Sequence, residues 1–194
     1  MSLFLGPIHY IVFEKIHLNE RITEKIVEIC GCGCDLDSFA PSVEKGELSE
    51  LIGDSMIHPW LAERVERAEI RQDRVIDKCF SEGVNKEILD AVYLIGKEVG
   101  DKIDSNQNLI EAFNRVRFNT LDGMPCDNGL VIIENTQDSI IWEINMELHS
   151  PYMEKEGSKE AFLDIRYALV RGLLDNSIFS LERLDKNRYR LYND

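Results

Sequence analysis

The chain has 194 residues, of which 44% are hydrophobic and 30% are charged, a balance typical of a folded globular protein and not of a disordered one. Because 36 aspartate and glutamate residues outnumber 22 lysine and arginine residues, the net charge of −14 disfavours nucleic acid and anionic membranes as partners. The apolar start lacks the basic region of a signal peptide, and no segment reaches about 18 uninterrupted apolar residues, so the sequence predicts a soluble cytoplasmic protein without a membrane span.

In the first half of the chain, apolar residues recur with the period of an α-helix. Four helices are expected, at residues 8–29, 58–80, 86–103 and 107–119. The segment 30–47 between the first two is rich in Gly, Pro, Asp and Ser, which predicts a loop. His58-Pro59 marks the start of the second helix, because proline suits the first helical turn. The charged face of that helix, over residues 63–78, is expected to be solvated.

The character of the chain changes at the Gly- and Pro-containing loop 121–129. Two β-branched runs, at 129–134 and 139–145, flank a polar turn, which is the pattern of a hairpin. A helical segment at 159–174 follows, and the alternating end of the chain, 178–194, predicts a second hairpin.

These elements predict an α+β fold, in which a four-helix N-terminal part packs with a small antiparallel sheet of two hairpins separated by a helix. We expect a single domain over residues 1–194, helical to residue 120 and mixed over 121–194. A homodimer could form through an exposed helix face, although no heptad pattern indicates a coiled coil.

Three of the four histidines and one cysteine lie within two residues of a proline: His9, His58, His149 and Cys126. Proline fixes its own φ and restricts the preceding residue, so these side chains are expected at rigid ends of elements. If they meet in one cavity, three imidazoles and a thiolate would suit Zn²⁺ or another divalent transition metal. The alternative is that histidine and proline both favour element boundaries, and the spacing matches no recognised metal-binding signature.

Three aromatic residues lie beside or near these positions: Tyr10, Trp60 and Tyr152. They could form the wall of a pocket for an apolar ligand. The alternative is that they are core residues whose polar atoms find one partner each.

Cys126 also has a catalytic interpretation, as a nucleophile with His149 or His58 as its base and a carboxylate to orient that base. The negative charge of the flanking Asp122 and Asp127 opposes this, because it suppresses the reactive thiolate. The alternative is a free cysteine in a turn.

The run CGCGC at residues 30–34 is the most unusual composition in the chain. The odd number of cysteines, five in all, and the absence of an export signal predict reduced thiols. Cys30, Cys32 and Cys34 could bind a soft metal or undergo redox chemistry. Three thiols alone make an incomplete zinc or iron–sulfur site, so a flexible loop of small residues is the alternative.

Two classes of function stay open. The first is a binding or sensing protein that holds a small molecule or a metal ion between the helices and the sheet. The second is a small hydrolase that uses Cys126 or a metal-activated water as its nucleophile. The sequence has no glycine-rich phosphate loop and no parallel βαβ pattern, so no nucleotide cofactor is expected.

Overall fold

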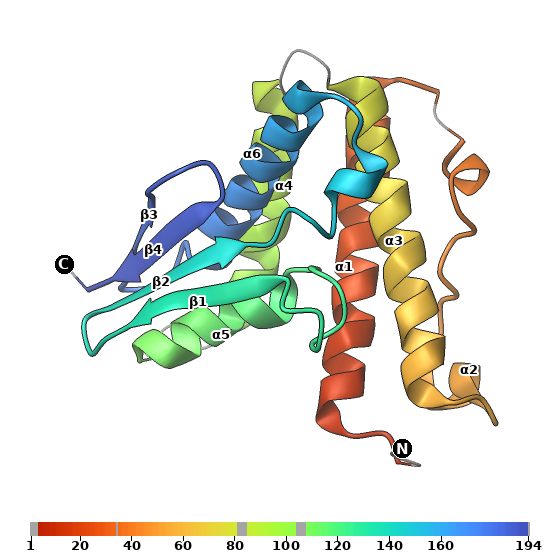
Figure 1. Cartoon of the computed structure of the whole chain (residues 1–194), viewed down its shortest axis with the longest axis horizontal. Helices are drawn as coiled ribbons and strands as arrows, with labels where there is room; N and C mark the ends of the chain where they lie inside the picture. The colour runs from red at the N-terminus through yellow and green to blue at the C-terminus, as the bar shows by residue number, and fades with distance from the viewer. Residues whose placement is uncertain (1–3, 34, 81–84, 104–107, 194) are drawn as a thin grey trace.

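The computed structural model describes residues 4–33, 35–80, 85–103 and 108–193 (Figure 1). Within these ranges the chain forms six α-helices and a four-stranded antiparallel sheet, so the predicted α+β fold is confirmed. The helices are α1 (Pro7–Cys30), α2 (Leu48–Ile52), α3 (Ile57–Cys79), α4 (Lys86–Gly100), α5 (Leu109–Asn119) and α6 (Glu156–Leu173). The strands are β1 (Leu130–Asn135), β2 (Ser139–Ile144), β3 (Ser180–Arg183) and β4 (Arg188–Tyr192), and two 3₁₀ turns are η1 (Leu36–Ser38) and η2 (Ser150–Tyr152).

The helix starts follow local side-chain chemistry. Helix α4 begins after Asn85, whose side chain accepts a hydrogen bond from the Ile88 N–H at 3.0 Å. Helix α5 begins after Asn108, which exchanges hydrogen bonds with Glu111 in a capping box. These side chains satisfy backbone N–H groups that the first turn of a helix leaves without a partner. The five-residue α2 was not among the predicted helices, because it is too short to show a helical period.

Helices α4 and α6 lie side by side with their backbones in contact (Figure 1). A Cβ added at Gly172 would lie 2.1 Å from the carbonyl oxygen of Tyr93, and one added at Gly96 would lie 2.4 Å from that of Leu169. Both distances are too short for real atoms, so any larger residue would push the two helices apart. Glycine lowers helix propensity by about 1 kcal/mol, and here the close contact of the two helices offsets that cost.

The two hairpins join into one sheet with the strand order β1-β2-β4-β3. At its centre Trp142 of β2 lies opposite Tyr189 of β4, with the two rings stacked 5.7 Å apart and each residue 1% exposed. Phe113 of α5 meets the Trp142 ring at 5.2 Å in an edge-on contact. Helix α5 therefore covers this face of the sheet and fixes it against the helices.

The buried apolar side chains form two clusters, and α1 and α3 contribute to both. Ile26 and Val75, from the later parts of these helices, belong to the larger cluster with α4, α5, α6 and the sheet. Ile16 and Leu61, from their earlier parts, belong to the smaller cluster with α2. That residues 1–194 form one domain stays a prediction.

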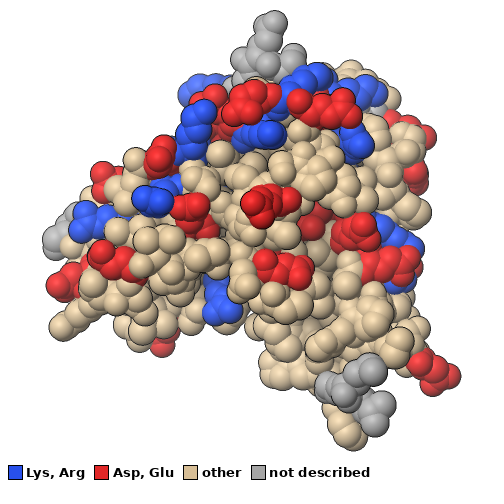
Figure 2. All heavy atoms as spheres, viewed as in Figure 1, with Lys and Arg blue, Asp and Glu red and all other residues tan. Residues whose placement is uncertain are grey.

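The charged side chains are unevenly placed on the face shown in Figure 2. Acidic and basic groups are intermixed along its upper edge, where α3 ends and α4 and α6 begin. The lower part of the same face is mostly uncharged. Among the described helices, none combines the length and apolar character needed to cross a membrane.

Candidate functional site

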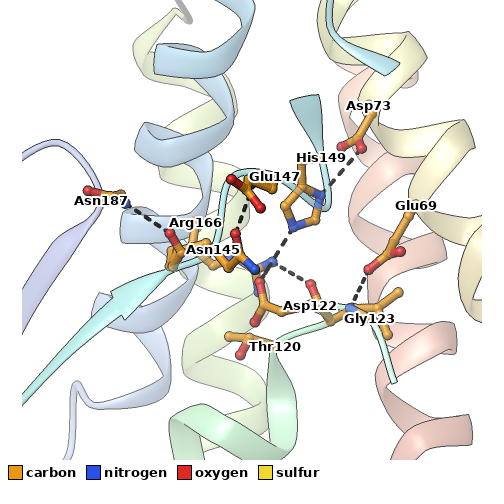
Figure 3. Close-up of polar contacts among 12 residues, drawn as sticks. Glu69, Asp73, Thr120, Asp122, Gly123, Asn145, Glu147, His149, Arg166 and Asn187 are labelled. Carbon is orange, nitrogen blue, oxygen red and sulfur yellow. Dashed lines mark hydrogen bonds and ion pairs between the residues drawn. The ribbon is translucent and has the colours of Figure 1, made fainter. Parts of the chain in front are cut away.

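Part of the charged stretch of α3 is buried, so the prediction of a solvated face over residues 63–78 is wrong for these positions. Glu69, Arg71 and Asp73 are only 7%, 3% and 0% exposed. The single Nε–H of Arg71 is shared between the two carboxylate oxygens of Glu20 on α1, each 3.0 Å away, and this bifurcated hydrogen bond ties the two helices together. Glu69 and Asp73 lie one helical turn apart and face a different set of partners (Figure 3).

A buried histidine, His149, lies between two carboxylates from separate parts of the chain (Figure 3). Its Nδ1 is 3.3 Å from Oδ2 of Asp73 on α3, and its Nε2 is 3.7 Å from Oδ1 of Asp122 in the loop after α5. The imidazole is 1% exposed, and its centroid lies 4.2 Å from that of Phe162 on α6. His149 directly precedes η2, which contains Pro151, so it lies at an element boundary, and its rigid placement stays a prediction.

The charge state of His149 follows from its neighbours. Burial alone would lower the pKa of His149, but the carboxylates of Asp73, Asp122 and Glu69 raise this pKa to about 10. At neutral pH the group is therefore an imidazolium that compensates buried negative charge. It cannot accept a further proton, which excludes it as a general base in this state.

The loop at Asp122-Gly123 is fixed from two further sides. Arg166 of α6 donates from its Nη2 to Oδ1 of Asp122 at 2.7 Å, and also to the carbonyl oxygen of Leu121 at 2.5 Å. Burial would raise the pKa of Asp122, but Arg166 and His149 outweigh it and lower this pKa to about 2. On the other side, the Gly123 N–H donates to Oε1 of Glu69 at 2.6 Å.

A cavity of about 100 Å³ lies against the outer side of this loop. It is enclosed by α1, the end of α5 and residues 122–130. Its apolar wall is formed by Ile8, Ile11, Val12, Phe118, Met124, Pro125 and Leu130. Its polar side chains are Lys15, Arg117, Asp122 and Asn128. Asp122 therefore belongs both to the buried network and to the wall of the cavity.

Lys15 and Arg117 form no hydrogen bond and no ion pair within the part of the chain that the structure describes. Burial lowers the pKa of Lys15, and the positive charges of Arg166 and Arg117 lower it further, while Asp122 and Glu69 act in the opposite direction. The cavity thus presents two positive groups that no side chain of this region neutralises directly.

The structure brings together two of the four residues predicted as metal ligands. Nε2 of His9 lies 3.1 Å from Nε2 of His58. The Gly6 N–H donates to Nδ1 of His9 at 2.9 Å, so the proton of a neutral His9 resides on Nε2 and is donated to His58. In this arrangement the two histidines form a hydrogen bond that joins the starts of α1 and α3. His9 has no free nitrogen for a metal ion, because its Nδ1 accepts from Gly6 and its Nε2 carries the proton.

His149 lies apart from that pair, so the four side chains do not share the single cavity that the sequence predicted. Asp73, the partner of His149, follows His58 by 15 residues on α3, which is about 22 Å at 1.5 Å per residue. Cys126 is exposed, and its thiol donates to Oδ1 of Asp127 at 3.7 Å. Within the described ranges, no three His, Cys, Asp or Glu side chains are grouped so as to hold a metal ion.

The three aromatic residues predicted as pocket walls do not line this cavity. Trp60 is 8% exposed and packs in the core, with its ring 6.1 Å from that of Phe13 and 3.7 Å from the guanidinium carbon of Arg64. Tyr10 is 43% exposed on α1, and Tyr152 is half-buried in η2. Trp60 is therefore a core residue, as in the alternative to a pocket wall given above.

The CGCGC run does not consist of reduced thiols alone, so that prediction is wrong for Cys32, which is disulfide-bonded. Gly31 and Gly33 both have a φ of 58°, a left-handed conformation that lets the run fold back sharply. Cys30, Cys79 and Cys126 are free. Burial raises the pKa of Cys30 to about 12, so its thiol is unreactive at neutral pH. Cys34 lies outside the described residues.

Lys15 and Arg166 were not among the predicted site residues, although the sequence pattern marks both of them. Lys15 stands four positions after Ile11, within the apolar stripe of α1, and Arg166 stands four positions after Phe162, within that of α6. A charged residue at an apolar position of a helical pattern indicates a buried charge with a specific environment.

Comparison of the chain with protein-family models, with curated proteins and with solved structures finds no match.

Proposed function

We propose that this protein binds a small molecule, as a binding or sensing protein, and that the ligand occupies the cavity between α1, the end of α5 and residues 122–130. The observation that carries the proposal is the Lys15 side chain, a cation that forms no hydrogen bond and no ion pair in the described region and lines this cavity beside an apolar wall. Ligand pockets combine mostly apolar walls with a few polar groups that orient the ligand.

The rigidity of the cavity floor supports the proposal. Asp122 is held by Arg166 and His149, and the next residue, Gly123, is held by Glu69. These contacts come from α3, α6 and the segment before η2, so the loop is fixed by elements distant in sequence. A site that is rigid before binding loses less conformational freedom when the ligand arrives.

The size of the cavity limits the ligand. An engineered apolar cavity of about 150 Å³ can hold benzene, and this cavity of about 100 Å³ is smaller. The enclosed part of a ligand therefore comprises only a few non-hydrogen atoms.

The geometry favours binding over the hydrolase interpretation. A cysteine nucleophile needs a base within hydrogen-bond reach. The thiol of Cys126 instead donates a hydrogen bond to the carboxylate of Asp127. His149 is buried with both ring nitrogens facing carboxylates, and it is protonated at neutral pH. Neither residue is arranged to act on the other.

The experiment fills the cavity and measures binding. Wild-type protein is screened by ligand-observed NMR against water-soluble compounds of about three to eight non-hydrogen atoms. Ile11→Phe adds an aromatic ring on the cavity wall, whereas Ile110→Phe makes the same change at a position that is 57% exposed on α5.

We expect compounds that bind the wild type and the Ile110→Phe variant alike, and that bind Ile11→Phe at least about tenfold more weakly. If no compound binds the wild type, or if Ile11→Phe binds every hit unchanged while remaining folded, the proposed site is wrong.

A further inference from the structure

Two positive side chains converge on the cavity from different helices. Lys15 comes from α1, and Arg117 from the last turn of α5. They lie close enough for the charge of Arg117 to act on Lys15. Like charges repel, and the half-buried ammonium of Lys15 also loses hydration, so an anion bound beside the two groups would stabilise both.

The nearby carboxylates are already engaged. Oδ1 of Asp122 accepts from Arg166 at 2.7 Å and faces Nε2 of His149 at 3.7 Å. Glu69 accepts from the Gly123 backbone at 2.6 Å. The buried network has three carboxylates, Glu69, Asp73 and Asp122, and two cations, Arg166 and the imidazolium of His149. With Lys15 and Arg117 at the cavity, four positive groups face three carboxylates, so one positive charge remains in excess. This local excess stands out in a chain whose net charge is −14.

Apart from Asp122 and Asn128, the other side chains of the wall are apolar, which narrows the chemical class of the ligand further. Ile11 and Val12 of α1, Met124 of the loop and Leu130 of β1 all line the cavity. The backbone N–H groups of Gly123 and Met124 are already bonded, to Glu69 and Asp127 respectively. A hydrated inorganic anion would leave the apolar wall unused, whereas a carboxylate with a short hydrocarbon chain would match both parts of it.

We infer that the ligand of this site is a short-chain monocarboxylate, whose anionic group binds between Lys15 and Arg117 and whose hydrocarbon part packs against Ile11, Met124 and Leu130. This inference rests on the proposed function, because it names the ligand class of the same cavity. Lys15 supplies a compact charge, and the planar guanidinium of Arg117 can donate two parallel hydrogen bonds to a carboxylate.

The test compares probes that differ only in charge or in the hydrocarbon chain. Butyrate, its neutral analogue butanamide and inorganic phosphate are titrated into the wild type by isothermal calorimetry. The same titrations use Lys15→Met, which keeps the length of the side chain and removes its charge, and Arg117→Met. Lys25→Met, on the same helix but ion-paired with Glu28, is the matched control.

Butyrate is expected to bind the wild type and Lys25→Met equally. It should bind at least about tenfold more tightly than butanamide, because only the carboxylate of butyrate pairs its own negative charge with the positive groups of the cavity. Lys15→Met should lose about tenfold or more in butyrate affinity and most of the preference over butanamide. Arg117→Met, at an exposed position, gives an independent result if Lys15→Met fails to fold.

Each contrary result has its own meaning. If butanamide binds as tightly as butyrate and Lys15→Met has no effect, the anionic class is wrong while the cavity remains a small-molecule site. Tighter binding of phosphate than of butyrate would overturn the monocarboxylate in favour of an inorganic oxyanion. If none of the three probes binds while the small-compound screen yields a cavity ligand, the inference fails alone, and if that screen fails too, the proposed function fails with it.

Discussion

Replacing His149 by glutamine removes the positive charge from the centre of the buried network and keeps a side chain of similar length. Asp73 then loses the cation of its ion pair, and Asp122 keeps its ion pair with Arg166. Removing one partner of a buried ion pair typically costs about 3–5 kcal/mol. The rise in the pKa of His149 from 6.5 to about 10 gives a similar upper figure, about 5 kcal/mol at 1.36 kcal/mol per pKa unit.

The sign of the pH dependence is fixed by the direction of that shift. Because the folded pKa of His149 is raised, its contribution is fully present below the unfolded value near 6.5 and is lost as the pH rises towards 10. Urea unfolding of the wild type and His149→Gln should therefore differ by about 3–5 kcal/mol at pH 6.5 and by much less at pH 9.5.

His17→Gln is the matched control, because burial lowers the pKa of His17 and its contribution has the opposite pH dependence. A difference between wild type and His149→Gln below about 1 kcal/mol, or one that stays constant between the two pH values, would refute the assignment of His149 as a charged centre.

Two further predictions concern contacts between helices. Gly172→Ala places a methyl group 2.1 Å from the Tyr93 carbonyl oxygen and should lower the free energy of unfolding, measured by thermal unfolding, by roughly 1–3 kcal/mol. Gly6→Ala, whose methyl group meets nothing within 4 Å, is the control and should lower it less. Equal effects of the two substitutions would contradict the close contact between α4 and α6. Burial and the neighbouring His58 lower the pKa of His9, so the stability that His9 contributes is lost as the pH falls below about 6.5. His58→Gln removes the neighbouring ring that lowers the pKa of His9 and should reduce the fall in melting temperature between pH 7 and pH 5, and an unchanged fall would contradict this.

Local patterns in the sequence predicted most of the fold. The helical period of residues such as Ile16 and Ile26 predicts α1, and the β-branched run of β2 predicts the first hairpin. These patterns depend on neighbours a few positions away, which is why they can be recognised in a single sequence. The five-residue α2 is too short to repeat such a pattern.

The site was harder to predict because its contacts are distant in sequence. Asp73 and His149 are 76 residues apart, and Arg166 and Asp122 are 44 residues apart. Pro151, two residues after His149, indicated a position at an element boundary but carried no information about the partners of His149. Similarly, the charged residues of α3 predict a solvated face in the sequence, whereas in the structure Asp73 is buried beside His149, which directly precedes η2.

The most direct measurement of the central claim is the titration of the Lys15 ammonium group by NMR, with selectively labelled lysine side chains in the full-length protein. Our account predicts that the pKa of Lys15 is below that of the surface lysines in the free protein, because the group is partly buried beside Arg166 and Arg117. Saturation with butyrate should raise this pKa, because a bound anion favours the charged form. If Lys15 titrates together with the surface lysines and does not respond to butyrate, the cavity is not an anion-binding site.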